Sequence, residues 1–207
     1  ANTGNLIEGM EIKGTLGKLY AKADRIDLGK EIARLNKIDL SDTAITLLMN
    51  DTTTNKDTTS TAVNWKLMLD QIDLDRVAFA MQIPGDSLRL STYIDKAGLT
   101  DGIVDLGSAR YSASQFLLSG SSLSYDGSYS DPAPGFDPAH IALNDVNIRI
   151  DSLLYGGRDI SARIKKFSAN DRSGLTLSSL TGDISSDSTT TVSYTHLRAH
   201  ETSAHLV

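Results

Sequence analysis

Three of the four histidines of the chain lie close together near its C-terminal end. The stretch His196–His205 reads HLRAHETSAH, with His196 and His200 four residues apart and Glu201 directly after them. On a helix these two histidines would share one face, at a spacing that a zinc ion can use. The order differs from the HExxH motif, because the glutamate follows the second histidine, and the chain has no cysteine to complete a site. We therefore predict no metal site here.

A different origin explains this stretch better. The run VSYTHLRAHET, Val192–Thr202, resembles a codon-by-codon translation of the transposase adapter used in sequencing libraries. Library scars have to be left out of fold reasoning. We therefore expect residues 192–207 to be an artefactual tail that packs on nothing, and residues 1–191 to be an internal piece of a longer protein.

Paired carboxylates are the next candidates for chemistry. Asp73 lies near Asp75, and Asp95 lies near Asp101. General acid and base carboxylates need opposed environments that separate their pKa values. These four instead fall in bends and on the polar faces of expected strands, so we interpret them as structural.

Two further features also favour structural roles. His140 stands alone after the sequence FDPA, where a single histidine is more often a satisfied surface or core group than a base. The pair Gly156-Gly157 lies between two strand patterns and no helix follows, so it predicts a hairpin turn and not a phosphate loop. We predict no catalytic residue, no cofactor and no enzymatic activity.

Composition excludes several classes of protein. The net charge is −6, the basic residues are scattered and aromatic residues are few, which argues against nucleic-acid binding. No apolar run approaches the roughly 18 residues of a membrane span. The absence of cysteine excludes a disulfide scaffold.

Apolar residues alternate with polar ones in most of the chain. Val77, Phe79, Met81 and Ile83, for example, are separated by Ala78, Ala80 and Gln82. Period two is the pattern of a strand with one apolar face. Helical periodicity is nearly absent, and GKEIARLNKI, the one short helix candidate, fits a strand slightly better. The sequence therefore predicts an all-β fold.

A degenerate repeat underlies this alternation. Its pattern is an apolar residue, a Leu two positions later, a polar dipeptide, and apolar residues five and seven positions after that Leu. The five copies are IDLSDTAITL from Ile38, IDLDRVAFAM from Ile72, AGLTDGIVDL from Ala97, FLLSGSSLSY from Phe116 and IALNDVNIRI from Ile141. The dipeptides SD, DR, TD, SG and ND consist of residues that bend a strand at low cost. Polar loops are expected near 51–61 and 127–138, where the sequence is low in apolar residues or rich in Pro and Gly.

A sheet with one continuous apolar face has to shield that face from water. Soluble monomers expose only a few hundred Å² of contiguous apolar surface, and no amphipathic helix is available to cover the face. The sheet either closes onto another sheet or curls into a trough that holds an apolar ligand, most simply lipid. The residues expected to line such a lipid groove are Ile45, Leu47, Phe79, Met81, Leu88, Leu90, Val104, Leu106, Leu123, Ile148 and Ile150.

Three stretches carry a resemblance to a known family. AGLTDGIVDLGSARYSASQFLLSGSSLSYD, GFDPAHIALNDVNIRIDSLLY and ARIKKFSANDRSGLTLSSLTG resemble the repeat region of TamB, the AsmA-like envelope proteins of the translocation and assembly module. The likeness covers about Leu16–Ser188 and rests on degenerate repeats. It implies an elongated, curled, antiparallel-rich sheet forming a U-shaped hydrophobic groove, a β-taco.

The same resemblance implies a cellular role. The parent protein would be periplasmic and anchored in the inner membrane of a Gram-negative bacterium. It would carry phospholipid between the inner and outer membranes, and would support outer-membrane protein assembly through a barrel partner. The alternative is a structural or adhesive β-sandwich or β-helix at the cell surface. A β-helix polysaccharide enzyme is less favoured, because no cluster of Asp, Arg or Lys recurs at matching repeat positions.

Overall fold

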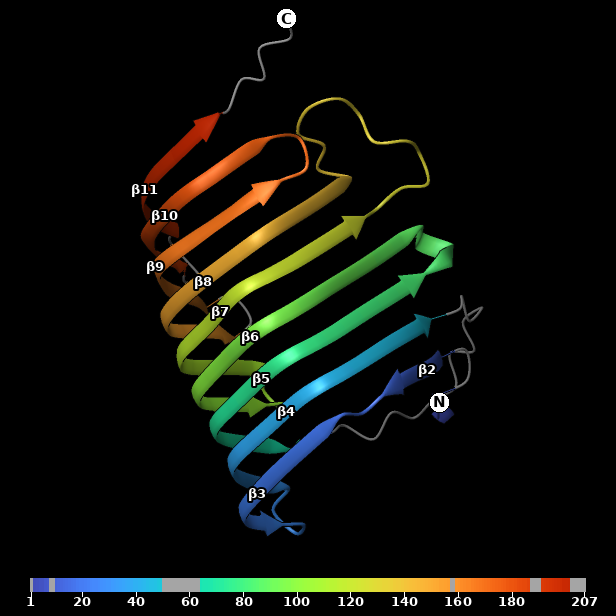
Figure 1. The fold of residues 1–207 in the computed structure, drawn as a ribbon. Helices are drawn as coiled ribbons and strands as arrows, with labels where there is room; N and C mark the ends of the chain where they lie inside the picture. Colours follow the sequence, from blue (N-terminus) through green and yellow to red (C-terminus); the bar gives the residue numbers. More distant parts are fainter. Residues whose placement is uncertain (1, 8–9, 50–63, 157–158, 187–190, 202–207) are drawn as a thin grey trace, which may run out of the picture.

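The chain forms a single eleven-stranded sheet that curls along the length of its strands (Figure 1). The computed structural model describes residues 2–7, 10–49, 64–156, 159–186 and 191–201, the first and last of these as backbone only. The strands are β1 (Asn2–Ile7), β2 (Met10–Thr15), β3 (Lys18–Asp27), β4 (Ile32–Met49), β5 (Lys66–Ile83), β6 (Leu88–Asp105), β7 (Arg110–Asp126), β8 (His140–Gly156), β9 (Asp159–Asp171), β10 (Leu175–Ser186) and β11 (Thr191–Glu201). One 3-10 turn, η1 (Pro84–Asp86), joins β5 to β6.

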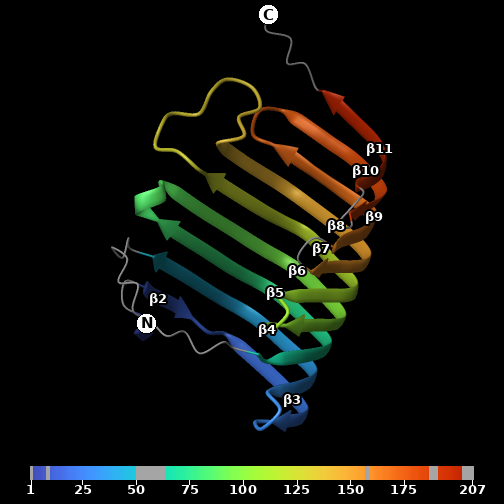
Figure 2. The same cartoon turned by 180° about the vertical axis from the view of Figure 1, so that it is seen from behind.

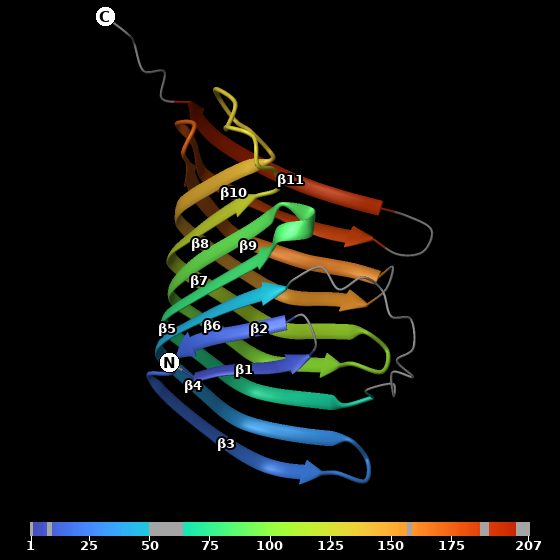
Figure 3. The same ribbon diagram turned by 90° about the vertical axis from the view of Figure 1, so that its right-hand side faces the viewer.

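The strands stack in nearly sequential order. From one edge to the other the order is β1-β2-β4-β5-β6-β7-β8-β9-β10-β11, and β3 pairs with β4 beside β2. Neighbours are antiparallel except β4 and β5, which are parallel. Seen from behind and from the side, the curl leaves one side of the sheet open (Figures 2 and 3). The predicted all-β, curled, antiparallel-rich sheet is confirmed.

The strands bend at the dipeptides that the repeat predicted. The second residue of each dipeptide has a positive φ, and these residues are Asp42 (53°), Arg76 (53°), Asp101 (49°), Gly120 (60°) and Asp145 (50°). The left-handed conformation is uncommon outside glycine, and Asp and Asn adopt it more readily than most residues. The predicted bend positions are therefore confirmed in all five copies.

Each bend also changes the side-chain alternation. A Cβ added to Gly102 would lie 2.5 Å from Leu99 Cδ2, so positions 99 and 102 face the same side although they are three residues apart. Two consecutive residues, Thr100 and Asp101, take the other side. A strict period of two would have moved the apolar residues to the opposite face at this point. The bend keeps them on one face.

The residues directly after the bends lie in the concave corner of the sheet. Their exposed fractions are 3% for Thr43, 5% for Val77, 1% for Ser121 and 4% for Val146. Register pairs Thr43 with Val77 and Ser121 with Val146, so they form part of one row across the sheet. In a single-layer sheet such burial arises on the side where neighbouring side chains converge. We call this the inner face, and the opposite one the outer face.

The expectation that the C-terminal tail packs on nothing is wrong. Backbone pairing joins β11 to β10 antiparallel, from Leu175 opposite Glu201 to Ser186 opposite Thr191. The physical reason is that an edge strand offers unpaired N–H and C=O groups to any extended segment, whatever its side chains. His196 and His200 lie on this strand, where residues four apart are about 13 Å apart, so the helical metal spacing does not apply. Their side chains, and His205 altogether, lie outside the described residues.

Other expectations can be placed on the fold. The candidate helix GKEIARLNKI contributes the start of β4, and Gly156 pairs with Asp159 across the predicted hairpin. The loop expected at 51–61 falls outside the described residues, whereas 127–138 is a described connection from β7 to β8. Among the described residues no helix has the length and apolarity needed to cross a membrane.

The bend at position 120 provides a test of this architecture. A Cβ at Gly120 would lie 3.3 Å from Asp95 Oδ2, and its φ is +60°. We expect Gly120→Val to lower the free energy of unfolding by about 1–2 kcal/mol more than Gly120→Asn, because a β-branched residue is disfavoured in the left-handed region where Asn is tolerated. Urea unfolding measures both. Equal losses for the two variants would show that space, and not backbone conformation, limits this position.

Candidate functional site

The inner face carries continuous rows of apolar side chains across the strands. Cross-strand pairing aligns the apolar residues of β4 to β8 in four rows. The rows are Ile38–Ile72–Leu99–Phe116–Ile150, Leu40–Leu74–Ala97–Leu118–Ile148, Ile45–Phe79–Thr92–Leu123–Leu143 and Leu47–Met81–Leu90–Tyr125–Ile141. The first two rows form a floor and the last two a wall. Thr92 interrupts its row, and its hydroxyl donates to the Ser122 carbonyl at 2.8 Å.

The residues expected in the lipid groove take places in this arrangement. Eight of them lie in the rows just described, namely Ile45, Leu47, Phe79, Met81, Leu90, Leu123, Ile148 and Ile150. Leu88 continues the wall by pairing with Ile83. Val104 lies on the opposite wall, paired with Leu67 and Tyr111. Leu106 follows the end of β6, and its N–H donates to the Trp65 carbonyl.

The exposure of these side chains is that of an open surface. Ile45 is 37% exposed and Leu106 is 39% exposed, and the other nine are half-buried. None is packed as a core residue is. The inner face is therefore apolar, continuous and accessible.

The expected set included Ile148 and Ile150 but omitted the rest of the floor and most of the opposite wall. Ile72, Leu74 and Phe116 are floor residues that the repeat already contained as its first or second apolar positions. Their signal was present, but the bend had to be known to preserve the face before they could be joined to Phe79. On the opposite wall, the rings of Tyr111 and Tyr155 stack with centroids 6.0 Å apart.

The outer face is charged and pairs its charges locally. Arg76 Nε lies 2.8 Å from Asp42 Oδ1, Arg163 Nε lies 2.8 Å from Asp183 Oδ1, and Lys37 Nζ lies 3.2 Å from Asp39 Oδ2. The hydrogen bond from Arg76 holds the pKa of Asp42 below its usual value. The two faces thus differ sharply, because the outer face presents ion pairs and the inner rows present apolar side chains.

The carboxylates considered for catalysis have separate partners. Asp73 accepts a hydrogen bond from Gln71, Asp75 contacts Arg76, and Asp101 accepts one from the Ser114 hydroxyl at 3.0 Å. A Cβ at Gly120 would meet the side chain of Asp95. Among the described residues no group of three or more His, Asp or Glu side chains is arranged to hold a metal ion.

A shallow trench of about 320 Å³ lies on the outer face. Five strands each contribute three consecutive residues to its lining, and the central residues are Ile45, Phe79, Thr92, Leu123 and Leu143. These central residues form one inner row, so the backbone of that row is the base of the trench. Its sides are mostly short Ala, Ser and Thr side chains such as Ala80 and Ser91. The trench reflects small residues on the outer face and offers no charged or deeply buried group.

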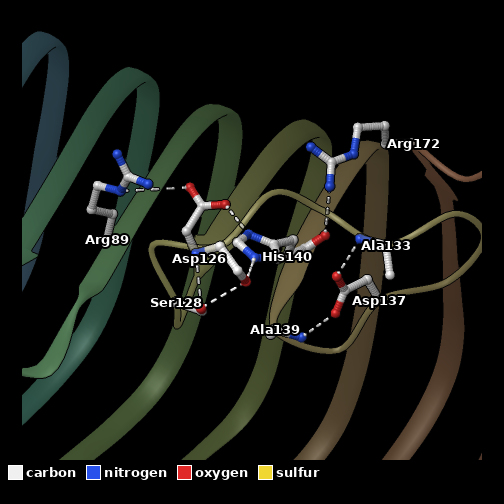
Figure 4. Close-up of polar contacts among 9 residues, drawn as sticks. Arg89, Asp126, Ser128, Ala133, Asp137, Ala139, His140 and Arg172 are labelled. Atoms are coloured by element: carbon white, nitrogen blue, oxygen red, sulfur yellow. Dashed lines mark hydrogen bonds and ion pairs between the residues drawn. The ribbon is translucent and has the colours of Figure 1, made fainter.

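A polar network fastens the connection between β7 and β8 at the rim of the sheet (Figure 4). His140 is 5% exposed, and its Nδ1 lies 2.9 Å from Asp126 Oδ1 while its Nε2 lies 3.4 Å from Ser130 Oγ. Arg172 donates to the His140 carbonyl at 3.1 Å. The Ser130 N–H donates a hydrogen bond to Ser128 Oγ at 3.0 Å. It is therefore not available as a donor to the oxyanion of a bound substrate. His140 is thus buried and has a partner at each ring nitrogen, as predicted for a satisfied group.

A second set of bonds fixes the same connection from Asp137. Its carboxylate accepts the N–H groups of Ala133 and Ala139, each at 2.9 Å. These bonds hold the pKa of Asp137 below its usual value. Further along the rim, the Tyr129 hydroxyl donates to the Pro84 carbonyl at 3.0 Å, and Arg89 lies over the Tyr129 ring. The connection is therefore anchored to neighbouring strands on both sides.

Comparison with known proteins adds no assignment. A scan against protein-family models and a search of curated proteins both give no match. The functional argument therefore rests on the residues and the geometry of the inner face.

The lowered carboxyl pKa values predict how stability depends on pH. Because ionised Asp137 is stabilised in the fold, its contribution is present above the ordinary value of 3.8 and is lost as the pH falls below it. Asp42 and Asp70, held by Arg76 and Asn36, have the same sign. We expect the free energy of unfolding to fall steadily as the pH is lowered below about 4.

Asp137→Asn provides the control for this prediction. The variant should be less stable than the parent at pH 7, because one amide oxygen replaces two carboxylate oxygens that each accept an N–H. It should also lose less stability between pH 5 and pH 2.5, a range that spans the ordinary aspartate pKa of about 3.9. Urea titrations across that range measure both. Parallel curves for parent and variant would contradict the role assigned to Asp137.

Proposed function

We propose that this protein is a non-enzymatic groove that carries the acyl chains of phospholipids. The observation that carries the proposal is the continuous apolar inner face, which no second layer covers among the described residues. A hydrocarbon chain is the simplest occupant, because it needs no hydrogen-bond partners and the inner rows offer almost none. An acyl chain gains about 0.8 kcal/mol for each CH₂ group that it buries.

The shape of the face suits transport more than permanent storage. The side chains that line it are half-buried or exposed and form an open trough, so a chain resting there keeps one side accessible. Partial burial yields only part of the transfer free energy for each CH₂ group. A chain held in this way can be retained and still move along the rows from strand to strand.

The cellular setting of the proposal follows the resemblance to the TamB repeats. The curled sheet agrees with the groove that this resemblance implies. We extend the proposal accordingly to a periplasmic parent protein anchored in the inner membrane. That parent would pass phospholipid to the outer membrane and support outer-membrane protein assembly with a barrel partner.

The alternative is a structural or adhesive surface protein. A β-sandwich would bury the inner face against a second sheet, whereas the described strands all belong to one sheet. A β-helix would close its strands into coils, whereas the pairing here runs from one open edge to another. The accessible apolar rows favour the groove, because a purely structural sheet gains nothing from leaving them open.

A pair of aspartate substitutions on adjacent residues tests the proposal. Phe79 lies in an inner row, and Ala80 lines the outer trench. We expect Phe79→Asp to abolish photo-crosslinking of a diazirine-labelled phospholipid to the inner wall. An ionised carboxylate in the path of the chain costs several kcal/mol if it is kept from water. Mass spectrometry of the crosslinked peptides measures the effect.

Ala80→Asp is the matched control, with the same charge one residue along the same strand. It should retain crosslinking, because its carboxylate points to the charged and solvated outer face. Circular dichroism should show an unchanged sheet in both variants, since neither substitution removes a backbone hydrogen bond. Equal crosslinking in the two variants would remove the case for a one-sided groove and favour the structural alternative.

A further inference from the structure

The inner face contains one partly enclosed pocket at the rim between β8 and β10. Its volume is about 220 Å³, and it is lined by Phe136, Ile141, Leu143, Phe167, Ala169, Asp171, Leu175 and Leu177. An apolar cavity of about 150 Å³ is large enough to bind benzene. The pocket therefore has room for several methylene groups, and seven of its eight lining residues are apolar.

Phe136 is the one lining residue that comes from outside the sheet. It belongs to the connection between β7 and β8, lines the pocket together with Ile141 and Leu143, and is 55% exposed. The next residue, Asp137, is fixed by the N–H groups of Ala133 and Ala139. The His140 network anchors the same connection at its end. The connection that carries Phe136 is thus fixed at the rim by polar bonds.

The pocket lies beside a floor row of the inner face. Phe167 lines the pocket and pairs directly with Ile148, which belongs to a floor row. A chain lying on the floor can therefore continue past Phe167 into the pocket without crossing a polar side chain. Its end would then meet Ala169, Leu177 and the ring of Phe136.

Asp171 gives the pocket one charged side chain. It is the one acidic residue of the lining, and its Oδ1 is buried with no hydrogen-bond partner, while its Oδ2 accepts the Ser173 N–H at 2.8 Å. Burial raises the pKa of Asp171, but hydrogen bonds from Ser173 and from the backbone of Ala142 and Arg172 together outweigh that effect and leave the pKa below its usual value. The carboxylate is ionised at neutral pH and repels a phosphate or carboxylate brought to the pocket.

We propose that this pocket is a seat for the methyl end of a lipid acyl chain, with Phe136 as the residue that closes it. The inference rests on the proposed lipid-carrying function and adds the orientation of the lipid: the chain end lies under Phe136, and the anionic headgroup lies toward the open side of the groove. A peptide segment is a poorer occupant, because its backbone N–H and C=O groups would find no partners among apolar side chains.

The test uses two photo-crosslinkable phospholipids that differ only in where the diazirine is placed. One carries it at the terminal carbon of the acyl chain and the other next to the headgroup. Both are incorporated in phosphatidylcholine vesicles and incubated with the full chain, and crosslinked peptides are mapped by mass spectrometry. We expect the terminal probe to label the pocket residues and the headgroup-proximal probe to label the inner face elsewhere.

Two alanine substitutions to phenylalanine make a matched pair of variants. Ala169→Phe places a ring inside the pocket, whereas Ala142→Phe places one in the outer trench of the neighbouring strand. Ala169→Phe should reduce pocket labelling by the terminal probe about tenfold, as expected if the seat for two or so methylene groups is lost. Floor labelling near Ile148 should persist. Ala142→Phe should change neither.

Phe136→Ala gives a second variant that fills no space and leaves every sheet hydrogen bond in place. It should weaken labelling of Leu143 and Leu177 by the terminal probe, because the cover over the chain end is gone. Equal labelling of the pocket by both probes would overturn the proposed orientation. Floor labelling without pocket labelling would overturn the seat but leave the groove in place. No labelling on the inner face by either probe would overturn the proposed function itself.

Discussion

Strict alternation of side chains along a strand is the constraint on which this structure depends. A sheet that must curl sharply and still keep its apolar residues on one side cannot follow period two through the bend. Here the bend takes two consecutive residues to the outer face, and the second of them adopts the left-handed conformation. The spacing of the repeat reflects that geometry, because apolar residues resume an odd number of positions after the last apolar residue before the bend.

The bend also explains how one layer of strands holds together without a conventional core. The corner residues Thr43, Val77 and Ser121 are nearly fully buried although no second layer packs on them. They converge because the sheet folds back on itself, and they are small or β-branched, as a tight corner requires. The outer face contributes ion pairs, whose individual effect on stability is small. The ladder of backbone hydrogen bonds and the buried corners therefore carry the fold, and the inner rows remain available for a ligand.

The sequence predicted the strands and the bends well and the tertiary detail less well. The five polar dipeptides located every repeat bend because the residues with positive φ are mainly Asp and Gly, whose local preferences are strong. The parallel pairing of β4 and β5 had no local signal, since it depends on a connection and not on the strands themselves. The pocket lined by Phe136 could not be predicted either, because it depends on the connection between β7 and β8, which His140 and Asp137 fix at the rim. The pairing of β11 was missed because backbone bonds at an edge do not require a side-chain pattern.

The central claim is that the inner face binds hydrocarbon chains. The most direct measurement is lipid analysis of the protein purified from a Gram-negative host without detergent, by organic extraction and mass spectrometry. The account predicts phospholipid in an amount comparable to that of the protein, and its loss when the inner wall is made charged. Protein that is folded by circular dichroism and free of bound lipid would contradict the account.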